Sequence, residues 1–206
     1  MGKACFLISV HTDAGKTISS AVLCKAMKAA YWKPLQTGVQ PGAPTDSDIV
    51  RALVPGIVTF PELVRLSDPS SPHQAAAMEG KELNDSSWKI PESEDPLIIE
   101  IAGGLMSPIH AHKTYLDWIK EWKLPVILVI PYYLGSINHS LMTLEILNMH
   151  SISVAGVVLN GKENPYSRSF IEQRCSFPVW GSIPFLSHLS VEEVARAAQS
   201  FSHCSL

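Results

Sequence analysis

The chain has 206 residues, 46% of them hydrophobic and 17% charged, which is enough apolar material for one globular domain and little for two. It carries 16 basic and 19 acidic residues, for a net charge of −3, and so lacks the positive field of a general nucleic-acid or anionic-membrane binder. The four cysteines form no CxxC pair, so a zinc site or a disulfide framework is not indicated. We expect reduced thiols in a soluble, cytoplasmic protein.

Five short apolar runs indicate β-strands. They are residues 5–10, 97–101, 126–130, 154–159 and 179–183. Because these runs lack polar alternation, they fit strands that are buried on both faces of a parallel sheet. No apolar run approaches the 18 residues of a membrane span, so we expect no membrane association.

Segments with helical spacing lie between the runs. Apolar residues share one helical face in residues 18–27 and again in 137–147. Ser71-Pro72 and Gly80 frame a short helix, and Ser190 with Glu193 forms a capping-box signature that opens a last one. Strand and helix alternate without a linker-like shift in composition, which predicts a single α/β domain over residues 1–206.

A phosphate-binding loop is the strongest functional signal. The sequence HTDAGKT, residues 11–17, stands directly between the first predicted strand and the first helix. Such a turn points backbone N–H groups and a helix N-terminus at phosphate oxygens, while Lys16 reaches the β/γ-phosphates and Thr17 binds Mg²⁺. A chance Gly-Lys-Thr is the alternative, and the placement between strand and helix argues against it. The first glycine of the motif is absent, because Val10 stands at its position and Ser9 one residue before.

Two carboxylates are candidates for the same metal ion, since Mg²⁺ prefers hard oxygen ligands. Glu100 ends an apolar strand, which places it at the carboxyl edge of the sheet where α/β proteins bind ligands. Asp48 begins a short helical stretch, and its neighbour Asp46 is the alternative. Lys33, in the segment KPLQTG, adds a second ammonium, which suits transfer of a terminal phosphoryl group.

Several segments in order resemble the dethiobiotin synthetase family. They are HTDAGKT, WKPLQTG, SDI, SSPHQAA, IEIAGGL, PVILVI, LGSINHSLMTLEIL, GVVLNG and GSIPFL. The resemblance runs from Phe6 to about Leu186, nearly the whole chain. It implies a P-loop NTPase-like three-layer sandwich with a mostly parallel central sheet.

The resemblance also implies a reaction in biotin biosynthesis. In that family, 7,8-diaminononanoate and CO₂ become the cyclic urea dethiobiotin, while ATP gives ADP and phosphate. One amine forms a carbamate, the carbamate takes the γ-phosphate to give a mixed anhydride, and the second amine displaces phosphate. The implied cofactor is Mg²⁺, with ATP as co-substrate.

Residue roles follow from the same resemblance. Lys33, Lys16 and Thr12 take catalytic positions, and Thr37 contacts the diamine. The metal ligands are Thr17, Asp48 and Glu100. The implied nucleotide contacts are Asp13, Ala14, Gly15, Lys16, Thr17, Ile18, Asp48, Glu100, Ile101, Ala102, Gly103, Asn160, Pro184, Phe185 and Leu186.

A shared active site is implied as well. Similarity to the family places Ser136, Ile137 and Asn138 on the substrate carboxylate of the neighbouring subunit, which requires a homodimer. The physics agrees, because a helix N-terminus attracts an anion. The alternative is that Asn138 has no role in binding and is simply a polar residue in the first turn of a helix.

The chain departs from the family pattern in four places. Ser9 and Ile101 replace glycines, and both put a β-carbon where close backbone approach is expected. Gly161 stands where an aspartate is common. Only five residues separate Met27 from Lys33, so we expect the second strand to be short or missing.

Two other functions compete with the ligase. A partition or septum-positioning ATPase, acting as a partner-regulated switch, would share the fold. Such proteins usually carry a second lysine early in the loop, and residues 9–13 contain none. A degenerate binding module is the third possibility, given the truncation and the missing glycines.

Overall fold

A parallel sheet forms the centre of the molecule. The computed structural model describes residues 3–206. Seven strands follow the order β11-β10-β9-β1-β6-β2-β4, and every neighbouring pair is parallel. Their bounds are β1 Ala4–Ser9, β2 Ala30–Trp32, β4 Thr59–Phe60, β6 Leu97–Glu100, β9 Val126–Pro131, β10 Val154–Gly161 and β11 Val179–Pro184.

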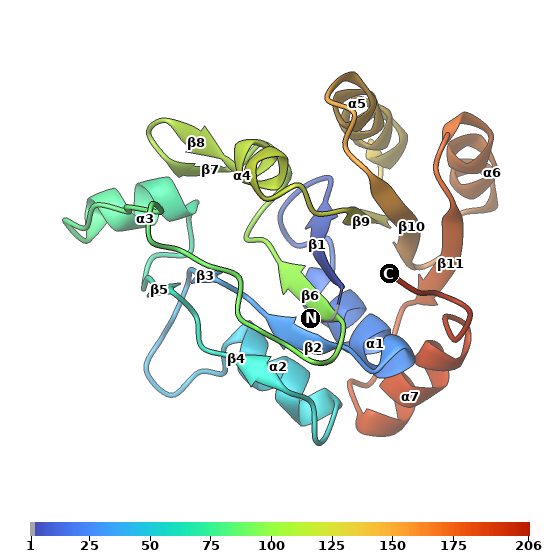
Figure 1. Ribbon diagram of the computed structural model, residues 1–206. Helices are drawn as coiled ribbons and strands as arrows, with labels where there is room; N and C mark the ends of the chain where they lie inside the picture. Colours follow the sequence, from blue (N-terminus) through green and yellow to red (C-terminus); the bar gives the residue numbers. More distant parts are fainter. Residues whose placement is uncertain (1–2) are drawn as a thin grey trace.

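Helices cover both faces of this sheet (Figure 1). On one face lie α1 Lys16–Met27, α2 Asp46–Leu53 and α7 Val191–Gln199; on the other lie α4 Tyr115–Trp122, α5 Ser136–Met149 and α6 Pro165–Arg174. Side chains of β1 alternate between two apolar cores, because successive residues of a strand point to opposite faces. Phe6 and Ile8 pack toward Trp118 on α4, whereas Cys5 and Leu7 pack toward Val22 on α1.

Smaller elements complete the chain. The short helix α3, Pro72–Met78, begins after Ser71, whose hydroxyl accepts a hydrogen bond from the Gln74 N–H. Two small sheets pair β3 Leu35–Gln36 with β5 Val64–Arg65, and β7 Pro108–His110 with β8 Lys113–Thr114. Within residues 3–206, no helix is both long and apolar enough to cross a bilayer.

The predicted α/β class and parallel sheet are confirmed, and each of the five apolar runs forms a strand. The second strand is short but present: β2 has three residues and pairs with β6 and β4. Helices α4 and α6 were not predicted. The first is opened by a capping box between Thr114 and Asp117, and the second by Asn164 followed by Pro165.

Gly156 of β10 is closely packed against the edge strand β11. A β-carbon at this position would lie 2.1 Å from Cε2 of Trp180 on the neighbouring β11. We expect Gly156→Ala to lower the free energy of unfolding by about 1–3 kcal/mol, because the indole must move. Urea denaturation measures this change, and an unaltered midpoint would show that Trp180 shifts without cost.

Candidate active site

The phosphate loop, residues 10–15, joins the central strand β1 to helix α1. Gly15 ends the loop with a φ of +78°, a conformation that favours glycine. Asn160 at the end of β10 donates a hydrogen bond to the Ala14 carbonyl over 2.9 Å. A β-carbon on Gly15 would lie 2.1 Å from Nδ2 of Asn160, so this close contact also requires glycine.

A cavity of about 490 Å³ opens beside this loop, at the carboxyl edge of the sheet. It brings together most of the predicted phosphate, metal and diamine residues. Its lining includes Thr12, Asp13, Ala14, Gly15, Lys16, Thr17, Ile18, Lys33, Thr37, Glu100, Ala102 and Gly103, together with Gln36 and Asp46.

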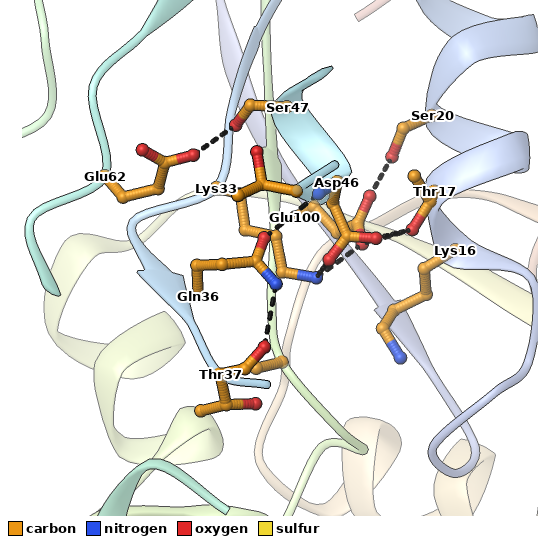
Figure 2. A network of polar contacts seen from close by, with 12 residues as sticks. Lys16, Thr17, Ser20, Lys33, Gln36, Thr37, Asp46, Ser47, Glu62 and Glu100 are labelled. Atoms are coloured by element: carbon orange, nitrogen blue, oxygen red, sulfur yellow. Dashed lines mark hydrogen bonds and ion pairs between the residues drawn. The ribbon is translucent and has the colours of Figure 1, made fainter. Parts of the chain in front are cut away.

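Lys33 lines this cavity and lies between two carboxylates, those of Asp46 and Glu100 (Figure 2). Its ammonium forms ion pairs with Asp46 and, over 3.0 Å, with Oε1 of Glu100. The side chain of Lys33 is 7% exposed and that of Glu100 is 1% exposed. Charges buried this deeply are costly unless they are paired, so the three groups depend on one another.

The pairing fixes the charge of each group. Burial alone favours the neutral amine, but Glu100 and Asp46 outweigh it and raise the pKa of Lys33 above its ordinary value. The pKa of Asp46 is lowered: burial opposes this, and the adjacent Lys33 ammonium prevails. Lys33 therefore stays protonated and cannot serve as a base, which suits a role in stabilising negative charge.

Lys16 differs, because it has no paired carboxylate at hydrogen-bond distance among residues 3–206. Burial lowers the pKa of Lys16 to about 8, with Glu100 opposing this effect and Lys33 adding to it. An anion entering the cavity would favour the charged form of this side chain.

Glu100 is held by donors from two other elements. Its Oε2 accepts hydrogen bonds from Ser20 of α1 over 2.7 Å and from Tyr31 of β2 over 3.1 Å. The other oxygen, Oε1, faces Thr17 and Lys33. The carboxylate therefore presents one fixed oxygen to the cavity.

Three oxygens converge in a way that fits a hard cation. Oγ1 of Thr17 lies 2.5 Å from Oδ1 of Asp46 and 3.2 Å from Oε1 of Glu100. Two carboxylates and a hydroxyl are the ligand types that Mg²⁺ prefers beside nucleotide phosphates. The residues present therefore fit the metal that the sequence implied, with Asp46 in place of Asp48.

Asp48 lies outside this group, which corrects the expectation that it stands beside Thr17 and Glu100. Its carboxylate accepts hydrogen bonds from the backbone N–H and the hydroxyl of Thr45, over 2.9 and 2.8 Å, and pairs with Arg51. Two positions along a helix rotate a side chain by about 200°, so Asp46 and Asp48 point in nearly opposite directions. The open alternative, Asp46, is the residue in the cavity.

Neither of the two residues that stand in place of a family glycine, Ser9 and Ile101, obstructs the site. Ser9 is fully buried, and its φ is not positive. The side chain of Ile101 is also fully buried and packs into the core on the α4 face, not into the cavity. The backbone N–H of Ile101 donates to the Leu7 carbonyl over 3.2 Å, so Ile101, expected as a nucleotide contact, does not line the cavity.

The residues expected at the base and at the substrate carboxylate lie outside the main cavity. Asn160 and Pro184 end β10 and β11, and Phe185 is exposed. Ser136 and Ile137 line a second hollow of about 460 Å³ at the start of α5, with Lys162 on its wall. Asn138 is exposed beside it.

Sequence reasoning missed three contributors to the site: Ser20, Tyr31 and Gln36. Gln36 is buried, and its Oε1 accepts a hydrogen bond from the Asp46 N–H over 3.2 Å. Gln36 stands in the quoted KPLQTG segment, which was the available signal. Nothing in the sequence distinguishes Ser20 or Tyr31 from ordinary core residues.

Comparison with known proteins decides the family. A family model described as "AAA domain" matches residues 3–193. The ATP-dependent dethiobiotin synthetase BioD of Christiangramia forsetii is 39% identical, over 95% of this chain and 96% of the relative. The chain belongs to the dethiobiotin synthetase family. The synthetase of Paramagnetospirillum magneticum is 42% identical over 81% of the chain and 80% of its own length.

A solved structure supports the fold. A ParA family ATPase from Chlorobium tepidum superposes with a TM-score of 0.53, covering 99% of this chain and 97% of its own. Its sequence identity is 14%, so the likeness establishes the P-loop α/β fold alone. The synthetase relatives, at much higher identity, make the switch-ATPase interpretation the weaker one.

The two aspartates of α2 give a matched pair of variants. We expect Asp46→Asn to reduce kcat at least about tenfold, because the charge beside Lys33 and Thr17 is lost from the site. Asp48→Ala should instead cost about 1 kcal/mol of stability through the lost cap, with activity nearly unchanged.

Steady-state assays and urea unfolding of both variants measure these effects. The reverse pattern, with Asp48→Ala inactive and Asp46→Asn active, would return the metal-side role to Asp48.

Proposed function

We propose that this member of the dethiobiotin synthetase family closes 7,8-diaminononanoate with CO₂ into dethiobiotin, at the expense of ATP, in the cytoplasm. The observation that carries the proposal is the cavity in which Lys16, Lys33, Asp46 and Glu100 meet beside the phosphate loop. Two ammonium groups and a cation-binding oxygen set are what transfer of a terminal phosphoryl group requires.

The nucleotide occupies the phosphate loop in this proposal. Backbone N–H groups of residues 13–18 and the N-terminus of α1 bind the phosphates, and Thr12 contacts them from the rim. Asn160 is proposed to contact the purine, with residues 184–186 beside it. The side-chain amide of Asn160 donates a hydrogen bond to the Ala14 carbonyl in this structure, so a purine held by Asn160 would lie next to the phosphate loop.

Thr17, Asp46 and Glu100 are proposed to hold Mg²⁺. When bound, the ion neutralises charge that develops on the transferred phosphate oxygens. Lys33 stays cationic beside these groups, because Glu100 and Asp46 raise its pKa. It can therefore bind the carbamate or the transferred phosphoryl group, and it does not remove protons.

Three covalent steps follow. One substrate amine attacks CO₂, which forms an N–C bond and releases a proton to give a carbamate. A carbamate oxygen attacks the γ-phosphorus, and the bond to the ADP oxygen breaks. The second amine then attacks the carbonyl carbon; the C–O bond to phosphate breaks, and the amine proton leaves. Lys16 and Lys33 stabilise the phosphoryl charge, and Thr37 orients the diamine.

The substrate carboxylate is proposed to bind the start of α5 in a partner subunit. Gly135 has a φ of +98°, and with Ser136 and Ile137 it lines the hollow of about 460 Å³ at the start of α5. The Ser136 N–H already donates to the Tyr133 carbonyl over 3.0 Å, so the N–H groups of Ile137 and Asn138 are the ones proposed to bind the carboxylate. Ile137 and Asn138 complete this end. The proposal requires a homodimer with two shared sites.

Lys16→Ala tests the catalytic assignment. We expect at least a 100-fold drop in kcat (about two orders of magnitude), since a charged donor to the transferred group is lost. Dethiobiotin formation under saturating substrates measures the change. Thermal unfolding serves as the fold control, and a folded variant with normal production would refute the role of Lys16.

Mixing two inactive variants tests the shared site. Lys16→Ala removes the phosphate contact, and Asn138→Glu places a negative charge beside the proposed carboxylate site. Random reassociation of the subunits should restore about a quarter of the wild-type activity, because half of the dimers then hold one intact site of two. No recovery, or a fully active monomer in sedimentation, would contradict shared sites.

The reaction itself is tested by ADP release with and without 7,8-diaminononanoate and bicarbonate. Release that depends on the diamine, with dethiobiotin as product, is the expected outcome. Diamine-independent turnover that a protein partner stimulates would favour the switch ATPase instead.

A further inference from the structure

Ser9 occupies the place where the phosphate loop leaves the central strand, and where related sequences are expected to carry a glycine. The residue is fully buried, and its φ is not in the positive range, so the backbone there does not call for glycine. What the serine adds is a hydroxyl inside the site, which glycine cannot supply.

This hydroxyl contacts three segments. Its Oγ lies 2.7 Å from the His11 carbonyl and 3.3 Å from the Gly103 carbonyl. The Nζ of Lys16 donates to the same oxygen over 3.0 Å. A hydroxyl has one hydrogen to give and two lone pairs to accept with. Since the hydrogen is directed at a carbonyl, a lone pair remains for the ammonium.

The contact uses only part of the ammonium. Lys16 is 7% exposed, and across residues 3–206 the only hydrogen-bond partner of its ammonium is the Ser9 hydroxyl. An ammonium has three N–H donors, so two remain for an anion in the cavity that Lys16 lines. A lysine side chain also loses considerable rotamer freedom when it is fixed.

We propose that Ser9 is a positioning residue that fixes the Lys16 ammonium toward the nucleotide phosphates before the nucleotide binds. The inference rests on the proposed function of Lys16 as a phosphate contact. By ordering the side chain in the free protein, Ser9 removes part of the entropy cost from nucleotide binding. Ser9 does not touch the reacting atoms and acts through Lys16.

Ser9→Ala is the direct test, with the dissociation constant of ADP measured by titration calorimetry. The expected result is an increase in Kd of about tenfold, a size that the rotamer freedom of one lysine side chain can account for. The KM for ATP should rise and kcat should fall, while the KM for the diamine stays unchanged. A general distortion of the fold would change all of these constants and the melting temperature.

Ser19→Ala is the matched control. Ser19 is a fully buried serine on the neighbouring turn of α1, and within the described chain its hydroxyl has no hydrogen-bond partner. Its variant removes the same atom without touching Lys16, so Kd should change by less than about twofold. If Ser9→Ala does not fold, Ser9→Cys keeps the shape of the side chain with a somewhat larger atom and replaces the oxygen with a weak acceptor.

The outcomes separate this inference from the proposed function. Wild-type protein that binds ADP and makes product, with a folded Ser9 variant that binds ADP equally well, would overturn the positioning role and leave the function standing. Equal losses in the Ser9 and Ser19 variants would also overturn it. Wild-type protein that binds no ADP would overturn both.

Discussion

The buried ammonium of Lys33 is the interaction on which the site depends. It joins a residue that follows β2 to Asp46 at the start of α2 and to Glu100 at the end of β6. Neither Lys33 nor Glu100 would be stable in this position as an unpaired charge, because an uncompensated buried charge costs several kcal/mol. Strand β2 has only three residues, and this pairing ties the segment that follows it to α2 and β6.

The same pairing prepares the cavity for an anion. Glu100 is saturated by hydroxyl donors on one oxygen, and Asp46 is held by Lys33 and the Gln36 amide. The groups that face the phosphate loop are therefore positioned before any ligand arrives, and little reorganisation is needed when charge develops. Lys16 differs in its charge and not in its position: burial lowers its pKa to about 8, so an anion that enters the cavity would strengthen the charged form.

Local pattern explains which features the sequence could predict. The strands of the five apolar runs could be predicted because each is a continuous apolar run. The phosphate loop could be predicted because a strand, Gly-Lys-Thr and a helix follow one another directly. The choice between Asp46 and Asp48 depended on where α2 begins, and the Thr45 capping box sets that boundary. Helix boundaries are the least certain feature of a sequence, and a shift of one residue turns a side chain by about 100°. Tyr31 and Ser20 reach Glu100 only through tertiary packing, so no local pattern could identify them.

The order of the strands in the sheet has a consequence for how the chain folds during its synthesis. The strand made first, β1, sits between β6 and β9, which are made much later in the chain. Until β6 has emerged, the almost wholly apolar β1 has neither of its neighbours, and until β9 has emerged it lacks one; contacts so distant in sequence form slowly. The nascent chain therefore carries its future central strand without a pairing partner while residues 10–96 are made, and during that stage a chaperone that binds short apolar segments would protect it.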